Sequence, residues 1–146
     1  MNTASRFAVA LGALLISIAA FAQSPKQRDA ENLARFERYA SAPQDSMHYF
    51  RIDRFQYLGP NANGSEAVAV WTGVNQVYLL SLESPCIKLE YANAIALTST
   101  SGNVNARMDF VKYDRDRQCR IETIRKVDYK AVRAEMKRAQ SAEGGT

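Results

Sequence analysis

Few side chains in this 146-residue chain have the chemistry needed for catalysis or metal binding. His48 is the only histidine, and no Gly-x-Ser-x-Gly motif supplies a serine nucleophile for it to activate. A zinc site needs three or four His, Cys or carboxylate ligands. One histidine and two cysteines that we expect to be paired do not provide them. The sequence therefore predicts no metal and no other cofactor.

Carboxylates are the remaining candidates for catalysis. Asp53, Asp109 and Glu122 could converge on one face of a sheet, where two carboxylates can act together in hydrolysis. Charged residues on neighbouring strands more often form surface ion pairs. A carboxylate-based hydrolase is therefore the least favoured of three candidate functions.

Aromatic and arginine residues favour a binding function instead. Trp71, the only tryptophan, and Tyr78 lie on the same predicted hairpin, and Arg107 and Arg120 belong to an arginine-rich region later in the chain. Arginine beside aromatic side chains can bind anionic ligands. Acidic residues interrupt this region and the net charge is only +4, so we expect no nucleic acid partner. These four residues form the candidate binding face of a non-catalytic module.

The partner of that face is expected to be an envelope protein or an anionic component of the cell envelope. A second interpretation is a small barrel that binds an apolar or anionic small ligand inside, because many large residues are predicted to point inward. The leading interpretation remains a small exported globular protein that acts as a non-catalytic binding or structural module of the cell envelope.

The first 22 residues have the pattern of a secretory signal peptide. Met1–Arg6 is positively charged, Phe7–Ala20 is apolar, and Ala20-Phe21-Ala22 resembles a cleavage site. The apolar run is shorter than the ~20 residues of a membrane-spanning helix. The sequence therefore predicts a periplasmic or secreted protein without a transmembrane segment after cleavage. We expect one domain over residues 23–140 and a disordered tail over residues 141–146.

Cys86 and Cys119 are predicted to form a disulfide, because two cysteines in an exported chain are usually paired. No Cys-x-x-Cys spacing suggests a redox site. The bridge would close a loop of about 34 residues and stabilise the fold by roughly 3.5–4 kcal/mol in the chain-entropy model.

The elements that would position these residues begin with a hairpin. Glu66–Ser84 contains two apolar, β-branched runs around the short connection Gly73–Gln76. Ser24 and Pro25 can start a helix before it, and Asp128 can cap a helix after it. Further strands are expected at residues 47–58, with a bend near 53–54, and at 87–91, 104–113 and 119–127, whereas residues 92–97 fit either a strand or a short helix.

These elements predict an α+β fold. It consists of an N-terminal helix, a bent antiparallel sheet of five or six strands that forms a small barrel or half-barrel, and a C-terminal helix, with one disulfide.

Several short motifs in this order resemble one protein family. They are Val70-Trp71-Thr72, Tyr78-Leu79-Leu80, Pro85-Cys86, Leu97-Thr98-Ser99 and Cys119-Arg120-Ile121. The set resembles a family of small exported bacterial proteins known only as a domain of unknown function, over roughly residues 36–132. The resemblance implies a signal peptide, one domain and two cysteines, with no assigned activity. Where the family commonly has Arg-Pro-Val-Asp, this chain has Arg125-Lys126-Val127-Asp128.

Overall fold

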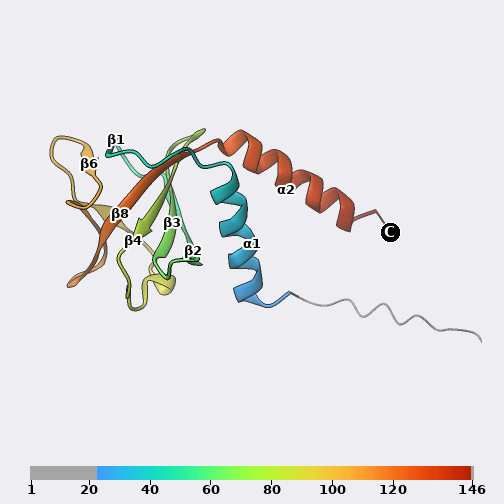
Figure 1. Ribbon diagram of the computed structural model, residues 1–146, viewed down its shortest axis with the longest axis horizontal. Helices are drawn as coiled ribbons and strands as arrows, with labels where there is room; N and C mark the ends of the chain where they lie inside the picture. The colour runs from blue at the N-terminus through green and yellow to red at the C-terminus, as the bar shows by residue number, and fades with distance from the viewer. Residues whose placement is uncertain (1–22, 146) are drawn as a thin grey trace, which may run out of the picture.

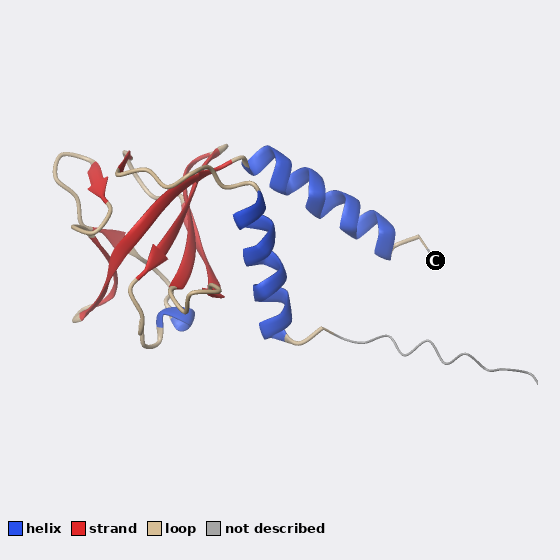
Figure 2. Ribbon diagram, in the orientation of Figure 1, coloured by secondary structure: helices blue, strands red, loops and turns tan. Residues whose placement is uncertain are grey.

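The computed structural model describes residues 23–145, in which a curved antiparallel sheet lies between two helices in the chain order (Figures 1 and 2). The predicted signal peptide, residues 1–22, lies outside the described residues. The elements are α1 (Pro25–Arg38), β1 (Ser46–His48), β2 (Arg54–Pro60), β3 (Glu66–Gly73), β4 (Gln76–Leu82), the 3₁₀ helix η1 (Leu89–Tyr91), β5 (Ala96–Leu97), β6 (Asn103–Asn105), β7 (Phe110–Asp114), β8 (Arg117–Val127) and α2 (Tyr129–Glu143).

Antiparallel pairing joins six of these strands in the order β2-β3-β4-β8-β7-β5, and β1 pairs with β6 in a second small sheet. A strap at residues 39–45 continues the sheet along β8. Its Ser41 amide donates to the Lys126 carbonyl (2.7 Å), and its Gln44 amide donates to the Ile124 carbonyl (2.8 Å). The sheet curls into a half-barrel, which confirms the predicted fold class.

The sheet has an apolar core on each face. Successive residues of a strand point to opposite faces, so Val68 and Val70 of β3 enter one core while Ala69 and Trp71 enter the other. The first, which we call the barrel core, contains the disulfide and includes Leu80 and other fully buried residues. The second, the helix-side core, contains Leu33 and Phe36 of α1. The predicted central hairpin β3–β4 contributes to both.

The prediction of a single strand over residues 47–58 was wrong in its extent. The chain forms β1 and β2, which belong to different sheets, with residues 49–53 between them. Phe50 and Ile52 have the opposite parity to Phe55 and Tyr57, and one strand cannot bury both pairs on one side. The chain resolves this conflict by ending one strand and starting another, and Phe50 is left 96% exposed.

The strand predicted at residues 104–113 is also two strands, β6 and β7, separated by a turn. The Asp109 carboxylate accepts hydrogen bonds from the Asn105 amide (2.7 Å) and the Thr98 hydroxyl (2.9 Å), which stabilises the turn. After this turn the parity is reversed. In a single strand Met108 would share the inward face of Val104, but it is 73% exposed, whereas Val111 is fully buried.

Residues 87–91 do not form the predicted strand. The chain turns at Lys88, whose φ of 68° is incompatible with an extended strand, and continues into η1. Leu89 is buried, but Ile87 and Tyr91 are exposed. Of residues 92–97, for which the sequence left strand and helix open, Ala96 and Leu97 form the short strand β5.

The two helices begin where the sequence predicted. The Ser24 hydroxyl accepts a hydrogen bond from the Gln27 amide (3.3 Å) at the start of α1, and the Asp128 carboxylate accepts one from the Ala131 amide (3.2 Å) at the start of α2. α2 buries Val132 and then extends away from the sheet (Figure 1), reaching Glu143 within the segment predicted as a tail. Within residues 23–145, no helix combines the length and apolar character needed to cross a membrane.

Candidate functional site

The four residues of the predicted binding face do not share one surface. Trp71 pairs with Val77 and Val70 pairs with Tyr78, so Trp71 and Tyr78 point to opposite faces of the sheet. They are only 4% and 9% exposed, because each is part of a different core. The prediction treated the two aromatic residues as neighbours on one side, but the pairing of β3 with β4 separates them.

The two arginines of that face lie elsewhere. Arg107 occupies the turn between β6 and β7, where it borders a small pocket of about 90 Å³ with Glu122. Arg120 on β8 stacks over Phe110, with 5.5 Å between its Cζ and the ring centre, and lies 3.8 Å from the Glu83 carboxylate. Both contacts are at the exposed surface and do not converge with Trp71.

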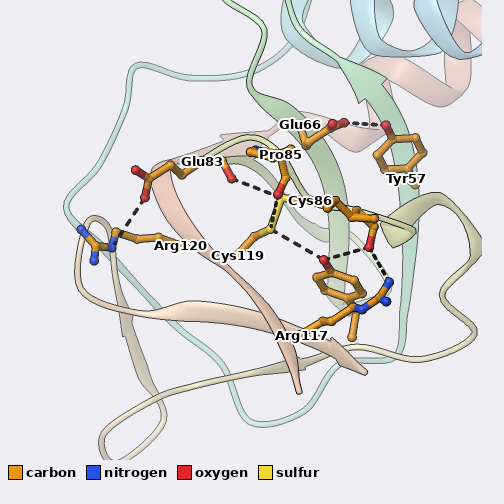
Figure 3. The surroundings of a disulfide bond; sticks show 10 residues. Tyr57, Glu66, Glu83, Pro85, Cys86, Arg117, Cys119 and Arg120 are labelled. Atoms are coloured by element: carbon orange, nitrogen blue, oxygen red, sulfur yellow. Dashed lines mark hydrogen bonds and ion pairs between the residues drawn. A yellow bond between two sulfur atoms is a disulfide. The ribbon is translucent and has the colours of Figure 1, made fainter. Parts of the chain in front are cut away.

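Cys86 and Cys119 form the predicted disulfide, with their Cα atoms 5.9 Å apart (Figure 3). Both residues are buried, and the bridge ties the segment that follows β4 to β8. The same segment is held by Tyr113 and Arg117, whose side chains donate hydrogen bonds to the Ile87 carbonyl (3.2 Å each). The bridge and these hydrogen bonds therefore hold the segment after β4 against β7 and β8.

The three carboxylates proposed for hydrolysis lie in separate networks. Asp53 forms an ion pair with Arg51 (2.8 Å), Asp109 stabilises its own turn, and Glu122 accepts a hydrogen bond from the Ser65 hydroxyl (2.5 Å). His48 Nδ1 contacts the Asn103 side-chain oxygen at 3.1 Å on the surface. In the part of the chain that the structure describes, no group of three or more His, Cys, Asp or Glu residues could hold a metal ion.

Trp71 instead joins three elements of the helix-side core. Its ring packs edge-to-face against Phe36 of α1 (5.8 Å between ring centres) and against Tyr129 of α2 (5.3 Å). Edge-to-face contacts of this kind add about 0.5–1.5 kcal/mol each beyond the burial of apolar area. The ring therefore fixes both helices against β3.

Arg54 covers the outer face of this aromatic cluster. It lies opposite Trp71 in the β2–β3 register, and its guanidinium Cζ is 3.9 Å from the centre of the indole ring. Its Nη2 donates a hydrogen bond to the Tyr129 hydroxyl (2.7 Å). Arg54 forms no ion pair with any carboxylate of residues 23–145. Stacking and the hydrogen bond thus orient a guanidinium whose other N–H groups are available.

Arg54 lines a pocket of about 350 Å³, and Tyr129 lines both this pocket and a second one of about 520 Å³. We call the two pockets together the basic end. Its cationic residues are Arg38, Arg54, Lys126, Lys130 and Arg133, of which Arg38 is paired with Glu135 (2.7 Å). Its acids are engaged, since Asp53 pairs with Arg51 and Asp128 caps α2. This end of the molecule therefore has a net positive charge and uncompensated hydrogen-bond donors.

Sequence reasoning missed Arg54, Tyr129 and Arg133. Arg54 lies on β2, whereas Tyr129 and Arg133 lie on α2, 75 or more residues later in the chain. The β2–β3 register brings Arg54 to Trp71, and the docking of α2 brings Tyr129 and Arg133 to the same pocket. The one sequence signal near this site was the bend expected at residues 53–54. It includes Arg54 but does not indicate which residue its side chain contacts.

One family model matches residues 1–143, a family of unknown function called DUF6491. The chain belongs to this family. The match confirms the predicted resemblance to a domain of unknown function and extends well beyond residues 36–132. No curated protein and no solved structure matches the chain. Because the DUF6491 family has no assigned activity, the function must be inferred from the geometry of the site.

Proposed function

We propose that this DUF6491 protein is an exported, non-catalytic module of the cell envelope that binds an anionic group at its basic end. The observation that carries the proposal is the Arg54 guanidinium, stacked on Trp71 and hydrogen-bonded to Tyr129 without a carboxylate partner among the described residues. The export and the envelope location rest on the signal peptide predicted at residues 1–22.

A guanidinium held in this way suits an anionic ligand. Arginine presents its N–H donors in a planar fork that matches the oxygens of a carboxylate or phosphate. Its stacking on Trp71 contributes about 0.5–1 kcal/mol at an exposed site and limits its rotation, so less entropy is lost on binding. Arg133 borders the same pocket and adds a second positive charge.

A binding function is supported better than hydrolysis at this site. The titratable side chains of the pocket are Asp53, Arg54, Tyr129 and Arg133. Asp53 is held by Arg51, and none of the four forms a nucleophile and base pair of the kind that acyl or glycosyl transfer requires. The interior of the half-barrel is occupied by the side chains of the barrel core, so nothing in the described residues favours an apolar ligand inside it.

The test is a titration of the protein with glycerol phosphate and, separately, with galacturonate. Binding is measured by calorimetry and by the fluorescence emission of Trp71, the only tryptophan. Arg54→Gln should weaken binding by about 10-fold to 100-fold, since a hydrogen bond to a charged group contributes about 1.5–3 kcal/mol. The matched control is Arg115→Gln, which removes the same charge from the exposed β7–β8 turn.

Equal affinity of the Arg54 and Arg115 variants would show that the site lies elsewhere. Absence of binding by the unaltered protein to both compounds would also count against the proposal. Comparing the two compounds distinguishes a phosphate ligand from a carboxylate ligand.

A further inference from the structure

The α1 side of the sheet changes from apolar to polar along the strands. Near the β3–β4 turn, Trp71, Val77 and Val127 lie side by side on paired strands, and the helix-side core covers them. Four residues earlier on β3, the corresponding row is Ala67, Ser81 and Thr123. Small and hydroxyl-bearing side chains there replace the large apolar residues that would be needed to pack a helix.

A groove of about 340 Å³ lies over this polar row. Its lining includes Glu37 of α1, Pro43 of the strap and four residues of the β2–β3 loop, namely Asn61, Ala62, Asn63 and Ser65. Its floor combines the hydroxyls of Ser81 and Thr123 with the buried Ala67, whose short side chain leaves space above the sheet. The groove is separate from the basic end, with which it shares no lining residue.

Glu122 is directed into the groove by a β-bulge. Leu82 pairs with Ile121 and Ser81 pairs with Thr123, so Glu122 is an extra residue on β8 without a partner on β4. Bulges redirect side chains and are common beside functional sites. The half-buried Glu122 carboxylate accepts a hydrogen bond from Ser65 and forms no ion pair with any described residue, so it can accept further hydrogen bonds.

The charge of the groove selects the class of ligand. Arg125 is its one cationic lining residue among residues 23–145. Its Nε donates to the Ser41 carbonyl (2.7 Å) and its Nη2 donates to the Ala40 carbonyl (3.2 Å), which holds the strap. The carboxylates of Glu37 and Glu122 then outnumber it. An anionic ligand would be repelled, whereas a ligand with several hydroxyl donors would be bound by the carboxylates and by Ser81 and Thr123.

We propose that this groove is a binding site for a hydroxyl-rich ligand, namely a saccharide, with Glu122 as its central hydrogen-bond acceptor. Hydroxyl groups both donate and accept, which matches a groove that offers carboxylates and hydroxyls together. The proposal stands apart from the anion site, because it depends on different residues at the opposite end of the same face.

The experiment is an NMR titration of ¹⁵N-labelled mature protein with a tetrasaccharide of N-acetylglucosamine and with one of glucose, each to millimolar concentration. Saturable shifts should concentrate at the amides of Ser65, Ser81 and Thr123. Glu122→Gln keeps the shape of the side chain but removes its charge, so it should weaken binding by about 10-fold or more.

The matched control is Glu143→Gln at the exposed end of α2, which should bind as the unaltered protein does. Thermal melting of each variant checks that it is folded, and Ser81→Val gives a second loss of a groove hydroxyl if Glu122→Gln is unstable. The proposal is overturned if neither tetrasaccharide shifts the groove amides, or if the Glu122 and Glu143 variants bind equally well.

Discussion

At the scale of single residues, Trp71 connects three elements of the fold. It contacts side chains of α1, α2 and β2, and its Nε1 is buried with no hydrogen-bond partner among the described residues. Its contribution to stability therefore comes from packing and stacking.

Trp71→Ala should lower the free energy of unfolding by about 3–5 kcal/mol, the range observed when a large buried aromatic side chain is removed. Urea denaturation measures this loss. Phe50→Ala is the control, because Phe50 is almost fully exposed and its removal should change stability by less than about 0.5 kcal/mol. Similar effects of the two substitutions would mean that Trp71 is not part of the core in solution.

Glu135 is the polar residue that ties α2 to α1. Hydrogen bonds from Tyr39 and then Arg38 lower the pKa of its carboxyl below the ordinary value of 4.5, although partial burial opposes this shift. Its carboxylate lies 2.7 Å from Arg38 and 3.4 Å from Arg35.

Because the pKa of Glu135 is lowered in the folded state, its ionised carboxylate stabilises the fold fully at pH values above the ordinary pKa of a glutamate. This stabilisation is lost as the pH falls through the lower folded-state pKa. Glu135→Gln should therefore be less stable than the unaltered protein at neutral pH, and the difference should shrink under acidic conditions. Unfolding midpoints of both proteins across this range measure it, and a difference that is independent of pH would contradict the assignment.

At the scale of elements, the disulfide is the main constraint on the irregular segment between β4 and β6. This segment contains η1 and β5, which contribute few residues to regular pairing. The bridge fixes one end of it to β8, and Leu89 and Leu97 anchor the rest in the barrel core.

Replacing both cysteines by serine should reduce the free energy of unfolding by roughly 3.5–4 kcal/mol, because the unfolded chain is no longer closed into a loop of about 34 residues. Denaturant unfolding measures the loss. The unaltered protein under reducing conditions should show the same stability as the double variant. A loss below about 1 kcal/mol would show that the bridge constrains little.

α2 depends on its first turns for attachment. Val132 is its buried residue, and Asp128 caps its start. Asp128→Ala should cost about 0.5–2 kcal/mol and increase fraying of the helix, since an amide at its start loses its hydrogen bond. Circular dichroism and thermal melting measure both effects. Ser141→Ala near the exposed end of α2 is the control, and an equal loss there would indicate that the cap does not determine the stability of α2.

At the scale of the whole molecule, stability should be graded from the sheet outward. β3, β4 and β8 lie inside the sheet, between β2 and β7, and carry most of its fully buried residues, whereas the residues of the last turns of α2 are exposed. Regions with many buried contacts open least often.

Hydrogen exchange followed by mass spectrometry should therefore show the slowest exchange in peptides from β3, β4 and β8 and the fastest in residues 138–143. β5 and η1 should exchange at intermediate rates that rise on reduction of the disulfide. Strong protection of residues 138–143 would contradict this order and would show that α2 is covered in solution.

The sequence by itself determined the elements whose signals are local. The capping residues Ser24 and Asp128 and the β-branched runs of β3 and β4 follow from short-range patterns, and they were predicted correctly. The pairing of Cys86 with Cys119, 33 residues apart, was also predicted correctly, but from the cysteine count together with the expected export. The prediction from local alternation was wrong at residues 104–113. The Asp109 carboxylate accepts hydrogen bonds that stabilise a turn there, and the residues after this turn point to the opposite side from the one predicted.

Only the tertiary structure decided which side chains share a surface. Trp71 and Tyr78 are close in sequence but lie on opposite faces, because Trp71 pairs with Val77 and Tyr78 is the next residue along β4. Arg54 reaches Trp71 through the β2–β3 register, and Tyr129 reaches it through the docking of α2. These contacts depend on how strands pair and helices dock across long separations, so no pattern within a short stretch of the chain specifies them.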